Sequence, residues 1–218
     1  DYDKVADLMS SRIENKMNQL YYSFLLENDQ SFSPNVLQYF PFLLFFFSIV
    51  GAGWYVFVSF YTSSIMLDDF EHSSIIKGYP ISFVQYIFTK CLTSLLYIVL
   101  FIGLIFICTL PLLFMNGAGD ASYPVVLYNG EPAIYEAGQY IAICVVSMVA
   151  ISVFVMLLSI ILNVLLKNMY LTLFVHIILF FLPTIFPSLI SLLPFNPLHF
   201  MNFNQLLNGY SLELKEPV

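Results

Sequence analysis

Charged residues are scarce in this sequence, and four long stretches contain no Asp, Glu, Lys or Arg at all. Only 10% of the 218 residues are charged, whereas a soluble domain carries about 25%. The uncharged stretches are residues 30–67, 91–119, 137–166 and 168–212. Each is longer than the ~20 apolar residues that a helix needs to cross the hydrocarbon core of a bilayer. These absences exclude a water-soluble globular domain and predict a polytopic membrane protein.

Basic residues and cysteines are also few, which excludes two kinds of binding site. The formal net charge is −7, so we expect no basic surface that binds nucleic acid. The three cysteines, Cys91, Cys108 and Cys144, are odd in number and follow no CxxC or Cys/His spacing. Neither a disulfide framework nor a zinc site is indicated, and these residues are interpreted as small apolar side chains.

Several catalytic motifs are missing. The sequence contains no P-loop, no His-Glu-x-x-His run and no Gly-x-Ser-x-Gly elbow. We therefore expect no catalytic residue, no bound cofactor or metal, and no ATP hydrolysis by this chain alone. The uncharged stretches also lack the carboxylates of an intramembrane metalloprotease. Ion channels and ion-coupled carriers usually place charges in their spans, so the pattern argues against these classes too.

The arrangement of apolar and polar residues predicts an all-α fold, a bundle of membrane helices. Residues 3–28 repeat apolar positions at a spacing of three and four, which predicts an amphipathic helix within an external segment 1–36. The loop 116–137 is rich in Gly and Pro and predicts a short β-hairpin around residues 125–130. Residues 194–218 are interpreted as an external or re-entrant segment. The predicted transmembrane helices are 37–67, 91–115, 139–166 and 170–193.

Basic residues near the ends of spans favour the cytoplasmic side of a membrane. Lys77 and Lys90 lie between the first and second predicted spans, and Lys167 lies in the short link between the third and fourth. Because this link is so short, the third and fourth spans should be antiparallel neighbours. We expect segment 68–90 and the link to be cytoplasmic, and the loop 116–137 to lie outside.

Segment 68–90 carries an ordered set of features: an acidic patch, an apolar and basic stretch, a proline turn, and a helix that leads into the next span. In this order the residues are Asp69 and Glu71, then Ile75, Ile76 and Lys77, then Pro80, Ile81 and Ser82, then Tyr86, Ile87 and Lys90. In this respect the chain resembles the ABC-2 type permeases, the membrane subunits of a class of ATP-driven exporters. The order of elements supports the resemblance over most of the chain, although segment 1–36 is longer than in the smallest members.

The resemblance implies a permease with six spans, of which the four predicted here are the second to the fifth. It implies a dimer with a second copy or a paralogue, and separate ATP-binding cassette subunits that bind ATP and Mg. The cargo would be amphipathic or hydrophobic (a peptide, an antibiotic or a lipid-like molecule), moved outward across a bacterial plasma membrane. Segment 68–90 would couple the spans to the ATPase. The residues implied in coupling are Asp69, Glu71, Lys77, Pro80, Ile81 and Lys90.

Several alternatives stay open. Segment 68–90 also fits a solvated loop with good helix caps, and the composition also fits a non-transporting membrane immunity or sensor protein that binds a peptide. His176, in the fourth predicted span, is either a hydrogen-bonded packing residue or part of a proton path or ligand site. The Phe-rich stretches 42–47 and 180–186 either face lipid or contact a hydrophobic substrate.

Overall fold

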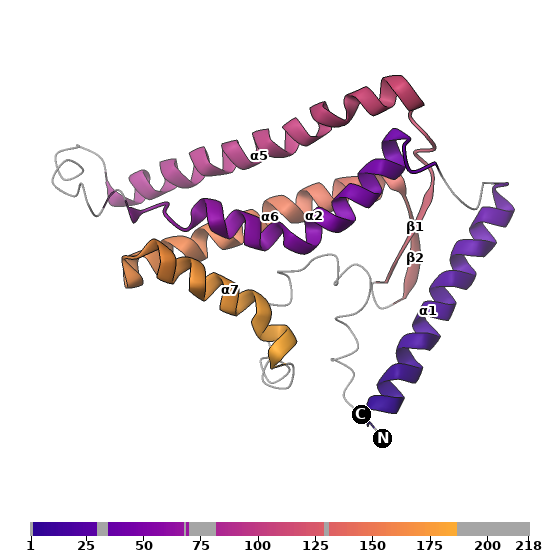
Figure 1. Cartoon of the computed structure of the whole chain (residues 1–218), viewed down its shortest axis with the longest axis horizontal. Helices are drawn as coiled ribbons and strands as arrows, with labels where there is room; N and C mark the ends of the chain where they lie inside the picture. Colours follow the sequence, from indigo (N-terminus) through magenta and orange to yellow (C-terminus); the bar gives the residue numbers. More distant parts are fainter. Residues whose placement is uncertain (1, 30–34, 68, 70–81, 129–130, 187–218) are drawn as a thin grey trace. The chain divides into compact units, whose positions relative to one another are not determined.

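The computed structural model describes residues 2–29, 35–67, 69, 82–128 and 131–186. These residues form five helices and one antiparallel two-stranded sheet (Figure 1). In chain order the elements are α1 (Tyr2–Glu27), α2 (Tyr39–Thr62), α5 (Phe83–Asn116), β1 (Pro124–Tyr128), β2 (Pro132–Glu136), α6 (Ala137–Leu166) and α7 (Met169–Ile185).

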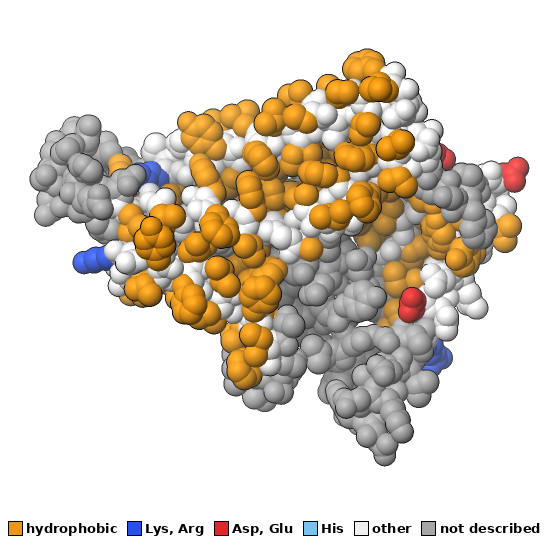
Figure 2. Space-filling view, viewed as in Figure 1, with side chains coloured by type: hydrophobic (Ala, Val, Ile, Leu, Met, Phe, Trp, Pro, Cys, Tyr) orange, Lys and Arg blue, Asp and Glu red, His pale blue; other side chains and the backbone are white. Residues whose placement is uncertain are grey.

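Three of the described helices, α2, α5 and α6, are long and apolar enough to cross a membrane. The shortest, α2, has 24 residues. At 1.5 Å per residue it is about 36 Å long, against about 30 Å for the hydrocarbon core. Figure 2 shows hydrophobic side chains along the visible face of α5. The predicted all-α membrane helix bundle is confirmed, together with the N-terminal helix, and the chain is a multi-pass membrane protein.

The first predicted span, 37–67, contains α2 but extends beyond it. After Thr62 the backbone forms four-residue turns, in which Ile65 N–H donates to Thr62 O at 3.1 Å and Leu67 N–H donates to Ser64 O at 3.1 Å. Hydroxyl side chains gather at this end of the helix, and Ser63 Oγ donates to Phe60 O at 3.0 Å. Serine and threonine side chains compete for backbone carbonyls in this way, which accounts for the earlier end of the regular helix.

The second predicted span, 91–115, lies inside α5, which begins earlier, at Phe83. A reciprocal cap defines this start: Ser82 Oγ accepts from Gln85 N–H at 3.3 Å, and Gln85 Oε1 accepts from Ser82 N–H at 3.2 Å. This is the capping-box arrangement, which satisfies two backbone donors that a helix N-terminus otherwise leaves unpaired. The helix therefore begins in the segment before the predicted span and runs into that span without a break.

The fourth predicted span, 170–193, begins as expected. α7 starts at Met169, and the side chain of Asn168 caps it by accepting from Leu171 N–H. The described helix has 17 residues, which corresponds to about 26 Å and falls short of the ~30 Å core. The rest of this prediction lies outside the described residues, as do segment 194–218 and most of segment 68–90.

The described chain divides into two compact units. The first contains described residues of 1–52 and 106–145. In it α1 packs along the β1–β2 hairpin, where Tyr21 and Tyr123 share a hydrogen bond between their hydroxyls (Figure 1). The hairpin pairs Pro124 with Glu136 and Tyr128 with Pro132. The predicted hairpin is thus confirmed.

The second unit contains residues 53–105 and the described residues from 146 onward. Its core combines large apolar side chains with a set of fully buried polar ones. The indole N–H of Trp54 lies 2.9 Å from Met148 O and 3.0 Å from Ser152 Oγ, so it joins α2 to α6. All of the site geometry described next belongs to this unit.

Candidate functional site

Asp69 and Lys90 join the chain beyond α2 to the start of α5. Lys90 Nζ lies 2.5 Å from Asp69 Oδ1 and also donates to Ile65 O at 3.0 Å. Tyr86, one helical turn before Lys90, donates its hydroxyl to the same Asp69 oxygen at 2.6 Å. We call Ile65, Asp69, Tyr86 and Lys90 the α2–α5 junction.

The junction is partly withdrawn from water, because the side chains of Lys90 and Asp69 are 27% and 11% exposed. Hydrogen bonds to charged groups are stronger than neutral ones, and removing one partner of a shielded pair leaves the other charge uncompensated. Asp69 Oδ2 is already buried without a hydrogen-bond partner among the described residues. Loss of either charge should therefore weaken the link between the chain beyond α2 and the first turns of α5.

Two of the six predicted coupling residues, Asp69 and Lys90, are brought together by this geometry. The other four, Glu71, Lys77, Pro80 and Ile81, lie outside the described residues. Sequence reasoning left Tyr86 out of the set, although its hydroxyl reaches Asp69. Its position four residues before Lys90 was the available signal, because residues at that spacing share one face of a helix.

A second polar feature is a buried chain of hydrogen bonds across α2, α6 and α7. Tyr55 OH lies 2.9 Å from His176 Nδ1, and His176 Nε2 lies 2.9 Å from Ser159 Oγ. Ser159 Oγ is in turn 2.8 Å from Thr62 Oγ1. All four side chains are fully buried. We call them the buried polar chain.

The donors along this chain can be assigned in one consistent order. Thr62 donates its proton to Val58 O at 2.9 Å, so it accepts from Ser159. Ser159 then accepts from His176 Nε2–H, and His176 Nδ1 accepts from the hydroxyl of Tyr55. This order requires a neutral imidazole with its proton on Nε2. Every polar atom of the ring is then paired, which favours the packing interpretation of His176.

One helical turn beyond the buried polar chain, α6 and α7 each carry a buried polar side chain without a hydrogen-bond partner among the described residues. Asn163 follows Ser159 by four residues on α6, and Thr172 precedes His176 by four residues on α7. Both side chains are fully buried, and the Asn163 amide and Thr172 Oγ1 have no hydrogen-bond partner among the described residues. Buried polar groups without partners cost free energy, so this is a weak point of the α6–α7 pair.

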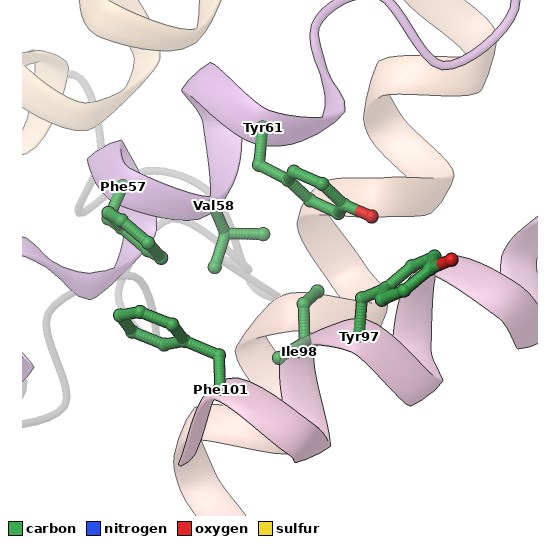
Figure 3. Close-up of a pocket in the computed structure, with 6 residues that line it drawn as sticks. All are labelled: Phe57, Val58, Tyr61, Tyr97, Ile98 and Phe101. Atoms are coloured by element: carbon green, nitrogen blue, oxygen red, sulfur yellow. The ribbon is translucent and has the colours of Figure 1, made fainter. Parts of the chain in front are cut away.

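The third feature is an aromatic cavity of about 380 Å³ between α2 and α5 (Figure 3). The rings of Phe57 and Phe101 are stacked, with their centroids 5.1 Å apart and 24° between their planes. Figure 3 shows the hydroxyls of Tyr61 and Tyr97 pointing to one side, away from these two rings. The lining is completed by aliphatic side chains: the full set is Phe57, Val58, Tyr61, Tyr97, Ile98 and Phe101.

In the part of the chain that the structure describes, no group of three or more His, Cys, Asp or Glu residues could hold a metal ion.

Comparison with protein-family models, with curated proteins and with solved structures finds no match to this chain. Function has to be inferred from the three features above and from the sequence pattern.

Proposed function

We propose that this chain is the membrane subunit of an ATP-driven exporter, working as a dimer with separate ATP-binding subunits in a bacterial plasma membrane. Its cargo is amphipathic or hydrophobic. The observation that carries the proposal is the α2–α5 junction: the charged residues that resemble a permease coupling segment pair with each other at the start of a membrane-spanning helix.

An exporter of this kind has to transmit movement from its ATP-binding subunits to its membrane helices. ATP binding in a soluble subunit drives transport only if it biases two arrangements of the membrane subunit. A push on the segment between α2 and α5 reaches Asp69 and Lys90 first. From Lys90 it passes into α5, which is helical from Phe83 to Asn116. A continuous helix carries such a displacement across the bilayer.

The side of the membrane is consistent with this role. Successive spans alternate in direction, so the junction and the short α6–α7 link lie at the same membrane face. Each carries a lysine, Lys90 and Lys167, and basic residues beside spans favour the cytoplasmic face. A cytoplasmic ATPase would meet the chain there.

A charge-exchange experiment tests the junction in the assembled transporter. Asp69→Lys and Lys90→Asp each place like charges together, so each variant should lower the amount of cargo moved per ATP hydrolysed. The double exchange restores opposite charges and should recover coupling. Glu131→Lys, at an exposed position between β1 and β2, is the matched control and should leave coupling unchanged.

Purification from the native membrane tests the wider proposal. An ATPase that co-purifies with the chain, and ATP hydrolysis that responds to cargo, are expected. Full peptide-binding activity in a preparation free of ATPase would instead identify a non-transporting immunity or sensor protein and would overturn the exporter proposal.

A further inference from the structure

The aromatic cavity between α2 and α5 has the dimensions and chemistry of a small-molecule site. Its volume, about 380 Å³, lies within the range of about 300–1,000 Å³ found for ligand pockets. We propose that it binds a planar aromatic molecule that carries a hydrogen-bonding group. Binding is a property of this chain alone, and only the further step, that such molecules are exported cargo, rests on the proposed function.

The floor of the cavity is a stack of nearly parallel rings. Trp54 stacks on Phe57 and Phe101, with centroid distances of 5.4 and 6.3 Å and interplanar angles of 28° and 27°. The indole is held by its hydrogen bonds to Met148 and Ser152. A flat ring that enters the cavity therefore meets rings that are already aligned, and pre-organisation of this kind lowers the cost of binding.

Two phenols lie at the rim of the cavity. Tyr61 and Tyr97 are 46% and 58% exposed, and their hydroxyls have no hydrogen-bond partner among the described residues. Both residues belong to helices that are long and apolar enough to cross a membrane, and a phenol that faces acyl chains finds no hydrogen-bond partner in them. Because both hydroxyls point to the same side, away from Phe57 and Phe101, a ligand reaches them if its hydroxyl, amide or similar group extends from its ring to that side (Figure 3).

A second groove on the same helix provides a comparison. It lies between α5 and α6, has a volume of about 490 Å³ and contains no tyrosine. Its lining includes Phe83, Phe88 and Leu92 of α5 and Met156 and Leu157 of α6. An acyl chain suits that groove. The two tyrosine hydroxyls and the stacked rings set the α2–α5 cavity apart and favour an aromatic occupant over a lipid tail.

The single tryptophan of the chain makes this proposal measurable. Trp54 stacks directly on two of the cavity's lining rings and is the only tryptophan in the sequence. The full chain in lipid nanodiscs would be titrated with 6-bromo-2-naphthol, a planar bicyclic phenol whose bromine quenches indole fluorescence at short range. We expect saturable quenching, in contrast to the linear quenching that partitioning into lipid produces.

Matched variants separate the site from the bilayer. Tyr97→Phe keeps the ring and removes one hydroxyl, so the apparent Kd should rise about threefold to tenfold, the worth of one hydrogen bond. Phe101→Ala should weaken binding further. Phe88→Ala, which alters the α5–α6 groove, should leave the Kd unchanged.

Two results would overturn the proposal. One is quenching that never saturates and is the same in all variants. The other concerns lipids with brominated acyl chains. If they quench Trp54 equally with and without the naphthol probe, the probe does not displace lipid tails from the cavity. Saturable binding without ATP-dependent transport would leave the site standing and reject the exporter. Transport without saturable binding would reject the site and leave the exporter standing.

Discussion

Ser159 and His176 are hydrogen-bonded to each other at 2.9 Å, with both side chains fully buried between α6 and α7. His176 uses its other ring nitrogen for Tyr55 of α2. One imidazole thus connects three helices. In a bilayer the alternative to such a bond is an unpaired polar group in a medium that cannot solvate it, so this residue should contribute strongly to the stability of the second unit.

We expect His176→Ala to destabilise the chain by about 3 kcal/mol or more, because it leaves the Tyr55 hydroxyl unpaired, removes the bond to Ser159 and creates a cavity. Thermal unfolding in a mild detergent measures the effect. Phe174→Ala, at a lipid-exposed position of the same helix, serves as the control and should change little. Unchanged stability of the His176 variant would contradict the assigned bonds.

The unpaired Asn163 and Thr172 should behave in the opposite way. Replacing both by apolar residues of similar size, Asn163→Leu with Thr172→Val, is expected to stabilise the chain by about 1–3 kcal/mol, because it removes buried groups without partners. The same unfolding assay provides the measurement. A loss of stability would show that these side chains are hydrogen-bonded in the membrane.

The cap at the start of α5 can be tested at single-residue resolution. Ser82→Ala removes the acceptor for Gln85 N–H and should weaken the first turn by about 1 kcal/mol. Amide hydrogen exchange is expected to quicken at the beginning of α5 and nowhere else in that helix. Thr93→Ala, which removes an exposed hydroxyl bonded within the helix to Thr89 O, should have no such effect.

Gly119 occupies a backbone conformation that requires glycine. Its φ is +73°, and an added Cβ would lie 3.0 Å from both Gln38 Cβ and Pro41 Cδ. Gly119→Ala should therefore destabilise the first unit by about 1–3 kcal/mol, seen as a lower Tm. Gly138→Ala, where a Cβ meets no atom within 4 Å, is the matched control, and equal effects at both positions would refute this explanation.

The contact between α1 and the hairpin should be sensitive to alkaline pH. Burial raises the pKa of Tyr123 above its ordinary value of 10.0, and its hydrogen bond with Tyr21 raises this pKa further. The folded protein therefore retains the phenol proton more tightly than the unfolded chain does. The resulting stabilisation is complete below pH 10 and is lost as the pH rises through the higher folded-state pKa.

The measurement compares hydrogen exchange of α1 at pH 9 and at pH values above 11, in the parent chain and in Tyr123→Phe. Exchange in the parent should accelerate more steeply than the chemical rate over this range, and the variant should lack the extra acceleration. The same profile in both proteins would count against the role of this phenol.

The sequence predicted the three helices that are long enough to span a membrane, because a lack of charge over twenty or more residues is a local property. The fourth predicted span is described only as the shorter helix α7. The hairpin was equally accessible, since Gly and Pro in the loop 116–137 limit the backbone to turns there. The boundaries were less certain. The end of α2 depends on hydroxyls that bond to nearby carbonyls, and the start of α5 depends on the pairing of Ser82 with Gln85.

The contacts within the candidate site could not be predicted from the sequence, because they form only when distant parts of the chain pack together. Asp69 and Lys90 both fall in the segment that resembles a permease, yet their pairing joins positions 21 residues apart. Tyr55 and His176 are 121 residues apart, and no periodicity within either helix connects them. The aromatic cavity combines one face of α2 with one face of α5, so neither helix reveals it alone.

The length of α5 bears on where its N-terminal end, which carries Lys90, lies relative to the lipid bilayer. Thirty-four residues extend for about 51 Å, well beyond the ~30 Å thickness of the lipid tails. The surplus must be accommodated by leaning of the helix or by projection of its ends into the headgroup layers. Lys90 is on the second turn, so a surplus at this end of the helix would place it at the level of phosphates and water. An ionic contact with Asp69 is inexpensive at that level, and a soluble protein can reach it without entering hydrocarbon.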